Sequence, residues 1–264
     1  MYEVLLSNKF CSLKFKGDNT FFEYCICDSE RTIDFSYPVL EIEGKTEQIR
    51  INHWRKPVLI EKNRNGMNEY LLKGISSNSG ILMNLYIHIL DESPVIRFRY
   101  ELFSELTCWL TKNSAKDNNT YFGVGLTGFE NFKEVSLSEF EALPYSSLAA
   151  DSETVQSSFE SSNLHLGTMF LACEKDNSFF LSYEKSLQNP GRILQFQSIP
   201  VPRLDVQFIA ANSLYNQIIR KELSFGTLWF ETGGVAGGEE ILTAGYRDFM
   251  VKCMEKTITS AERA

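Results

Sequence analysis

The side chains that could do chemistry in this sequence are 34 acidic residues and only three histidines. Imidazole is the usual acid or base near neutral pH. His53, His88 and His165 lie outside any Gly-rich setting, and no G-x-S-x-G nucleophile motif occurs. We therefore expect the histidines to be structural. Carboxylates offer another chemistry, since glycosidic-bond cleavage uses two of them about 5 to 10 Å apart, but composition selects no pair.

Two short segments, residues 52–55 and 183–188, combine aromatic, charged and amide side chains. Such a mixture suits sugars, because an aromatic ring covers the C–H face while polar groups bond the hydroxyls. The candidate carbohydrate contacts are Trp54, Arg55, Tyr183, Glu184 and Gln188. The alternative, that each segment is purely structural, stays open.

Metal and nucleotide chemistry have little support in the sequence. No His or Cys pair has zinc spacing, and no carboxylate loop has the calcium pattern, so we predict no metal site. Gly123–Gly128 matches G-x-G-x-x-G but lacks a βαβ context, and Gly233–Gly238 lacks the Lys-Ser/Thr of a P-loop. We expect no cofactor, a strand end or turn at the first segment, and a strand-to-helix turn at the second.

Charge and cysteine usage narrow the partners and the compartment. The net charge of −8 and the pI near 5.1 repel phosphate backbones and anionic lipid, so we expect neither nucleic acid nor membrane as a partner. No apolar run approaches the roughly 18 residues of a membrane span, and the N-terminus does not look like a secretory signal. The six scattered cysteines are interpreted as reduced thiols, which predicts a cytoplasmic location.

The elements that must position these residues are mainly strands. In the segment 80–90, Ile81, Met83, Leu85, Ile87 and Ile89 alternate with a more polar set. A turn signal at 91–94 and a second alternating segment at 95–102 follow, which together predict a β-hairpin.

Further strands are expected at 9–15, 20–27, 58–61, 178–183, 193–197, 204–209 and 227–231. Many short strands separated by turn signals indicate an all-β antiparallel sandwich. The polar residues 111–120 are interpreted as an exposed loop.

The C-terminal part breaks the period-two pattern. Leu242, Tyr246, Phe249 and Cys253 fall at helical spacing after two glutamates, and lysines follow near the end. This predicts an amphipathic helix over 239–256. Residues 257–264 carry no core pattern and are interpreted as a linker or frayed end.

Five segments together resemble the N-terminal domain of alpha-galactosidase (melibiase)-type glycoside hydrolases. The first, Ser178–Phe196, resembles a tyrosine-containing motif of that domain, and Thr227–Glu240 with Ala244–Phe249 resembles its closing strand, turn and helix. Glu134–Phe140 and Ser93–Tyr100 are also similar. The resemblance covers most of the chain in the same order.

The resemblance implies a β-supersandwich, galactose mutarotase-like in fold, over residues 1–238, with a C-terminal helix and linker over 239–264. In that family the sandwich packs against a (β/α)8 barrel that carries both catalytic aspartates, so no catalytic residue transfers to this chain. Its implied partners are oligo- or polysaccharide, a barrel in the same polypeptide, and a second copy in a homo-oligomer. Lys185-Ser186-Leu187 replaces the family's His-Gly-Ser, which puts that loop's role in doubt.

Three functions follow as alternatives. The chain is expected to be a non-catalytic domain of a glycoside hydrolase that supports carbohydrate binding, the active-site rim or oligomer assembly. It could instead be a free-standing carbohydrate-binding module. The third alternative, a small sugar-modifying enzyme on the same sandwich, requires a histidine or a carboxylate pair that converges on a concave sheet.

Overall fold

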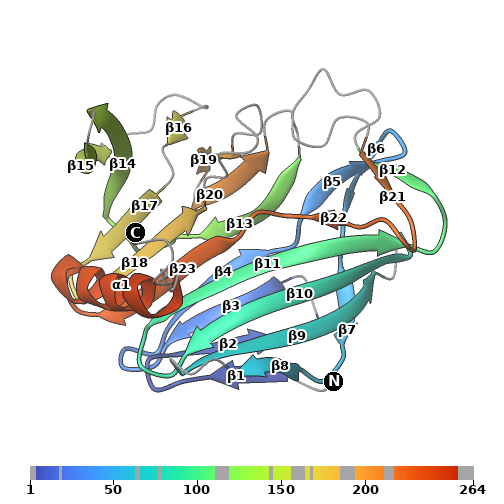
Figure 1. Ribbon diagram of the computed structural model, residues 1–264, viewed down its shortest axis with the longest axis horizontal. Helices are drawn as coiled ribbons and strands as arrows, with labels where there is room; N and C mark the ends of the chain where they lie inside the picture. The colour runs from blue at the N-terminus through green and yellow to red at the C-terminus, as the bar shows by residue number, and fades with distance from the viewer. Residues whose placement is uncertain are drawn as a thin grey trace, which may run out of the picture.

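Two antiparallel β-sheets packed face to face make up most of the described chain (Figure 1). The computed structural model describes residues 4–17, 20–62, 66–76, 79–110, 119–142, 145–155, 164–166, 169–184, 194–201, 203–210 and 217–254. Among these residues the only α-helix is α1 (Glu239–Met254). The all-β sandwich expected from the sequence is therefore confirmed.

The first sheet, sheet I, contains in spatial order β1 (Val4–Ser7), β2 (Cys11–Phe15), β3 (Thr20–Ile26), β4 (Arg31–Ser36), β13 (Thr120–Gly125), β20 (Arg203–Ala210), β19 (Leu194–Val201) and β16 (Leu164–Leu166). It branches beside β13 into β5 (Val39–Ile42), β6 (Lys45–Gln48), β12 (Cys108–Leu110) and β21 (Gln217–Ile219).

The second sheet, sheet II, runs through β15 (Tyr145–Val155), β14 (Asn131–Ala142), β17 (Met169–Glu174), β18 (Asn177–Tyr183), β23 (Phe230–Ala236), β11 (Val95–Ser104), β10 (Ile81–Leu90), β9 (Met67–Ser76) and β7 (Ile51–Trp54). The short β22 (Phe225–Gly226) pairs with β11, and β8 (Val58–Lys62) pairs with β9. The strands from β18 to β9 in this sheet have an inner face toward sheet I and an outer face away from it.

The core between the sheets is unusually aromatic. Phe22 and Phe35 of sheet I stack with ring centroids 4.2 Å apart. Phe98 of sheet II meets Phe22 at 5.2 Å and Phe122 at 5.3 Å. Phe230 contacts Phe122 from the neighbouring strand at 4.9 Å. Since burying one such ring stabilises the fold by about 1.5 to 3 kcal/mol, this cluster holds the two sheets together.

Polar ties also cross between the sheets. The Tyr24 hydroxyl on β3 donates to the Pro94 carbonyl at 2.6 Å and accepts from the Gly234 amide of β23 at 2.9 Å. A Cβ at Gly234 would lie 2.8 Å from the Ile26 side chain, so only glycine allows this close approach. The Gly233–Gly238 segment, expected as a turn, is therefore strand as far as Ala236, and the turn itself is short.

The helix α1 packs on the outer face of sheet II (Figure 1). Leu242 and Phe249 of the helix join a second apolar core with Leu90, Val95 and Phe180 of the sheet. Two glutamates lie in its first turn and Lys252 in its last, as suits the helix dipole. The predicted helix is confirmed, and the described part ends at Met254. The proposed division at residue 238 stays a prediction.

The hairpin of β10 and β11 is confirmed with the expected alternation. The other expected strands are present within a few residues, except that the strand expected at 227–231 begins only at Phe230. The expected exposed loop at 111–120 is wrong at its end, since Asn119 is buried, with its Oδ1 accepting from the Glu41 amide, and Thr120 opens β13. Residues 111–118 and the expected linker at 257–264 lie outside the described residues.

Candidate functional site

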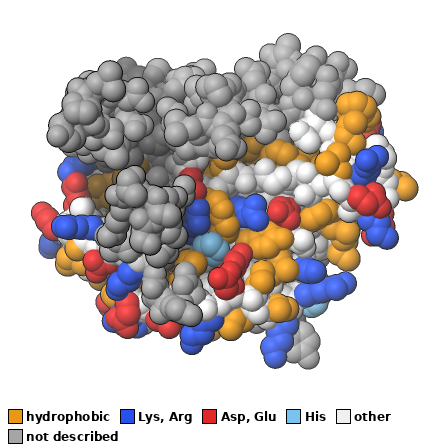
Figure 2. Space-filling view, in the orientation of Figure 1, with side chains coloured by type: hydrophobic (Ala, Val, Ile, Leu, Met, Phe, Trp, Pro, Cys, Tyr) orange, Lys and Arg blue, Asp and Glu red, His pale blue; other side chains and the backbone are white. Residues whose placement is uncertain are grey.

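A row of ionisable side chains crosses the outer face of sheet II. The pairing registers place Glu69 of β9, His88 of β10, Arg97 of β11 and Glu231 of β23 side by side, one from each of four adjacent strands. Neighbouring side chains in such a row lie about 4.5 to 5.5 Å apart. Figure 2 shows charged side chains of both signs across the middle of this face, with hydrophobic ones around them. We call these four residues the charged row.

Trp229, just before β23, lies over two members of the charged row, His88 and Arg97. Its ring lies 4.4 Å from the His88 ring and 4.3 Å from the Arg97 guanidinium carbon. Arg99 stacks against the same ring at 5.1 Å. His88, beneath the Trp229 ring, is 6% exposed, and Glu231 is 2% exposed. Two members of the row, His88 and Glu231, are thus buried on the side of the sheet away from the main core, and Glu69 and Arg97 are partly exposed.

Glu231 holds its proton unusually strongly. Burial raises the pKa of the Glu231 carboxyl to about 7, and repulsion from Glu184 adds to this, while the Tyr246 hydrogen bond and Arg97 oppose it. The Tyr246 hydroxyl of α1 donates to Glu231 Oε2 at 2.9 Å. Glu231 Oε1 makes no hydrogen bond among the described residues. Arg97 instead forms its ion pair with Glu184.

His88 is held in its neutral form. Burial and the nearby Arg97 and Arg99 lower its pKa to about 4. His88 Nε2 lies 3.5 Å from Glu69 Oε1, and neither ring nitrogen makes a hydrogen bond within the described part of the chain. Near pH 7 the row therefore combines a neutral imidazole with a carboxyl that gains or loses a proton.

This arrangement meets part of the requirement of the third alternative. Glu231 and Glu184 converge on Arg97, with His88 on the other side of that arginine. A carboxyl with a pKa near 7 can exchange protons with a substrate at neutral pH. However, Trp229 lies over His88 and Arg97, and neither glutamate lines the pocket described below.

A polar network continues from the charged row along the strands. Arg99 lies over the Tyr86 ring at 4.8 Å, and its Nη2 is 3.5 Å from Glu101 Oε1. The Tyr86 hydroxyl lies 3.0 Å from Glu101 Oε2 and donates to it. Glu101 stands opposite Asn84 across the hairpin. The network thus extends from the row to Asn84.

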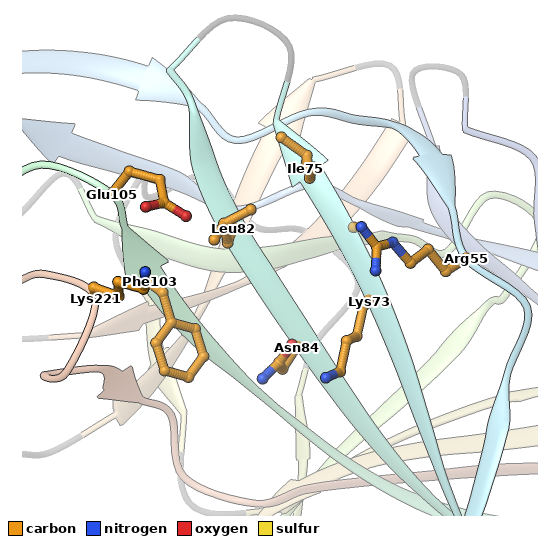
Figure 3. A pocket seen from close by; sticks show the side chains of 9 residues that line it. Arg55, Lys73, Ile75, Leu82, Asn84, Phe103, Glu105 and Lys221 are labelled. Carbon is orange, nitrogen blue, oxygen red and sulfur yellow. The ribbon is translucent and has the colours of Figure 1, made fainter.

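At Asn84 the network reaches a pocket of about 270 Å³ on the same outer face, which we call the sheet II pocket. Figure 3 shows Arg55, Lys73 and Asn84 on one side, Glu105 and Lys221 on the other, and Leu82 with Phe103 between them. The residues that line it are Arg55, Lys73, Gly74, Ile75, Leu82, Asn84, Phe103, Glu105 and Lys221.

The structure separates the aromatic candidates from the polar ones. Trp54 is 4% exposed and packs against Phe15 at 5.9 Å, and Tyr183 is 7% exposed within the same core. Neither ring is exposed as a platform for a sugar, which agrees with the structural alternative for these two side chains. The reason is strand alternation: successive side chains point to opposite faces, so Trp54 and Tyr183 face inward while Arg55 and Glu184 face outward.

Arg55 lines the sheet II pocket, and Glu184 pairs with Arg97 beside the charged row. Gln188 lies outside the described residues. The two predicted segments are not brought together, because β9, β10, β11 and β23 separate β7 from β18. At about 4.8 Å per strand this is roughly 24 Å.

Sequence reasoning missed Lys73, Lys221 and Glu231. The available signal was the polar half of the hairpin alternation, where His88 faces Arg97 and Asn84 faces Glu101. Lys73 was out of reach because β9 was not predicted as a strand. Lys221 lies in a turn that reaches the pocket only through the fold.

Two features were not found in the described part of the chain. Among the described residues, no group of three or more His, Cys, Asp or Glu side chains is placed to hold a metal ion. In the same part of the chain, no helix has both the length and the apolarity that crossing a membrane requires.

Sequence comparison finds no relative: no protein-family model matches, and no curated protein matches. Structure comparison does find relatives of the fold. GH36 α-galactosidase AgaA from Geobacillus stearothermophilus, solved in complex with raffinose, superimposes with a TM-score of 0.63 at 8% identity, over 97% of this chain and 44% of that one. An α-galactosidase from Lactobacillus brevis gives a TM-score of 0.58 at 10% identity, over 95% and 42%.

An α-N-acetylgalactosaminidase from Bifidobacterium bifidum, solved with GalNAc, matches with a TM-score of 0.52 at 10% identity, over 100% of this chain and 41% of that one. The chain therefore has the fold of a β-sandwich part of these glycosidase chains. It spans less than half the length of the solved structures it matches.

Proposed function

We propose that this chain is the N-terminal, non-catalytic sandwich domain of an α-galactosidase-like glycoside hydrolase. In this role it packs against a catalytic barrel of the same polypeptide and supports carbohydrate binding at the active-site rim. The observation that carries the proposal is the extent of the match to AgaA, 97% of this chain against 44% of that one.

The cluster on the outer face of sheet II supports the same proposal. Its charged row and network supply carboxylates, guanidinium groups, an amide and an indole, the groups that recognise sugar hydroxyls and C–H faces. Arg55 and Glu184 are the proposed direct contacts. Trp54 and Tyr183 are proposed to act as positioning residues: their rings are anchored in the core and fix the backbone next to Arg55 and Glu184.

The experiment compares the 264-residue chain with the polypeptide translated from the complete reading frame, using an aryl α-galactoside as substrate. We expect no turnover by the chain alone and turnover by the complete polypeptide. A reading frame without a barrel, or turnover by the chain alone that disappears when Glu231 is changed to Gln, would contradict the proposal.

A free-standing carbohydrate-binding module is the second candidate, and the sheet II pocket favours it. It predicts millimolar or tighter binding of raffinose by the chain alone in calorimetry, with loss in the Asn84→Ala variant. A flat titration would count against it.

Two further proposals concern the setting of the protein. A cytoplasmic location is supported by the free thiols of Cys11, Cys25, Cys27, Cys108 and Cys173. A homo-oligomer is proposed as well, and sedimentation of the chain across a tenfold concentration range tests it.

A further inference from the structure

We infer that the sheet II pocket binds an anionic sugar, namely one pyranose ring that carries a carboxylate or a phosphate. The inference rests on the proposed function, because it names the substrate class of a face that is proposed to handle carbohydrate. It goes beyond that function, because the neighbours in the structure comparison include complexes with raffinose and with GalNAc, both uncharged sugars.

The charge of the pocket is the first argument. Arg55, Lys73 and Lys221 supply three positive charges, and Glu105 supplies one negative charge. This local excess of two positive charges occurs in a chain whose net charge is −8. A concave site with an excess of one charge raises the local concentration of the opposite ion.

The second argument is that the pocket cations have no ion-pair partner among the described residues. Elsewhere on the outer face the guanidinium groups are neutralised, Arg97 by Glu184 and Arg99 by Glu101. No salt bridge involves Arg55, Lys73 or Lys221 among the described residues. Within the described part of the chain, the charges of the pocket cations are therefore not neutralised by ion pairs and can attract an anion, whereas Arg97 and Arg99 are each paired with a glutamate.

The rows of the sheet explain how these groups meet. The Arg55 amide donates to the Lys73 carbonyl at 2.8 Å, so the two side chains leave adjacent strands on the same face. Lys73 stands opposite Asn84 on β10. One edge of the pocket is thus an ordered line of a guanidinium, an ammonium and an amide.

The floor of the pocket is apolar. Ile75, Leu82 and Phe103 form the next row across β9, β10 and β11. Such a floor covers the C–H face of a pyranose, while Asn84 can bond a ring hydroxyl. A bare inorganic anion would leave the apolar floor unused, so the combination favours a sugar with a charged substituent.

The part of the sheet II pocket near Arg55 is supported from below by side chains of the core. A Cβ at Gly74 would lie 2.3 Å from Ile51 Cγ2 and 3.1 Å from the Trp54 ring, so the backbone of β9 lies directly on these side chains. Trp54 thereby acts as a positioning residue beneath the pocket. The volume of about 270 Å³ is small for a ligand pocket, which suits a single ring rather than an oligosaccharide.

The test is a calorimetric titration of the chain with methyl α-D-galacturonide, galactose 6-phosphate, methyl α-D-galactoside and inorganic phosphate. We expect at least one anionic sugar to bind about tenfold or more tightly than the neutral glycoside and than inorganic phosphate, and to weaken in high salt. The two anionic arms distinguish a carboxylate ligand from a phosphate ligand.

The variants are Lys73→Ala and Arg55→Ala, with Lys45→Ala as the matched control. Lys45 is exposed on β6 of sheet I, so its loss changes the net charge equally without touching the pocket. We expect each pocket variant to weaken the anionic sugar about tenfold. The control should leave that affinity unchanged.

Each outcome decides the inference. Equal binding of the neutral and anionic glycosides, insensitive to Lys73→Ala, would overturn the inference while leaving the proposed function standing. Equal binding of inorganic phosphate and the sugar phosphate would overturn it as well, because the pocket would then recognise charge alone. The complete reading frame and the aryl α-galactoside assay test the proposed function, and they do so independently of this titration.

Discussion

The two faces of sheet II are built from the same strands but carry different kinds of side chain. On β10 the inner residues Met83, Leu85 and Ile87 are at most 1% exposed and pack against sheet I. The intervening residues of the same strand include Tyr86 and His88, which join charged neighbours on the outer face. The inner face is buried by apolar packing along the strand, whereas the outer face combines an apolar part beneath α1 with the charged row and the sheet II pocket.

The two faces therefore contribute differently to the stability of the fold. Apolar burial stabilises the fold directly, whereas a buried ionisable group costs free energy unless its partners satisfy it. Glu231 and His88 each retain buried atoms without a hydrogen bond among the described residues. Folding alone therefore does not explain the outer face, and this contrast can be tested variant by variant.

The largest effect is expected on the inner face. Phe98 is 1% exposed and contacts four phenylalanines, so Phe98→Ala should lower the free energy of unfolding by about 3 to 5 kcal/mol. The control Phe98→Leu keeps most of the apolar volume and should cost markedly less. Urea denaturation measures both variants. A loss below about 1.5 kcal/mol in Phe98→Ala would contradict the claim that the inner face makes the largest contribution to stability.

The next effect is a pH dependence of opposite sign for two outer-face residues. Because the pKa of Glu231 is raised from 4.5 to about 7, its contribution to stability is complete below pH 4.5 and is lost as the pH rises through 7. The pKa of His88 is lowered from 6.5 to about 4, so its contribution is complete above pH 6.5 and is lost as the pH falls through 4.

Each shift corresponds to about 3 kcal/mol, so the two slopes nearly cancel between pH 4.5 and 6.5 in the unmodified chain. Glu231→Gln should leave a stability that rises with pH in this window, and His88→Gln one that falls. Chemical denaturation across the pH range measures the slopes. Identical slopes in both variants would contradict the assignment of the charged row.

A smaller effect is expected where α1 meets the outer face. Tyr246→Phe removes the hydrogen bond to Glu231 Oε2 and should cost about 1 to 2 kcal/mol. Because that bond lowers the pKa of Glu231, its removal should raise the pKa further. Carboxyl-carbon NMR measures the titration, and the double variant with Glu231→Gln should lose most of the Tyr246 effect.

The smallest effect on stability is expected in the sheet II pocket. Lys73 is exposed and forms no salt bridge among the described residues, so Lys73→Ala should change the free energy of unfolding by less than about 0.5 kcal/mol. Urea denaturation beside Phe98→Ala gives the measurement. A loss above 1 kcal/mol would mean that the pocket has a structural role.

Much of the fold was predictable, because an alternation of apolar and polar residues indicates a strand with one buried face. The segment 81–90 shows this, since its odd-numbered residues are all apolar and all lie inward. The strand at Gly233 and Gly234 was not predictable, because these two glycines are explained by close contacts with Tyr24, Ile26 and Phe180 from distant segments.

The candidate site was predictable only in part. Arg55 and Glu184 were selected for their neighbours Trp54 and Tyr183, and alternation then placed the aromatic rings on the opposite face. The sequence does not reveal which strands are adjacent. The row that joins His88 to Glu231 and the pocket that joins Lys73 to Lys221 therefore became visible only in the folded chain.

The central claim, that the outer face of sheet II is the binding face, is tested most directly by methyl NMR during titration with methyl α-D-galacturonide. We predict shifts at Ile75 and Leu82 in the sheet II pocket and none at Leu85 and Ile87 on the inner face. Unchanged Ile75 and Leu82 signals at saturating sugar, or shifts confined to other parts of the chain, would contradict the account.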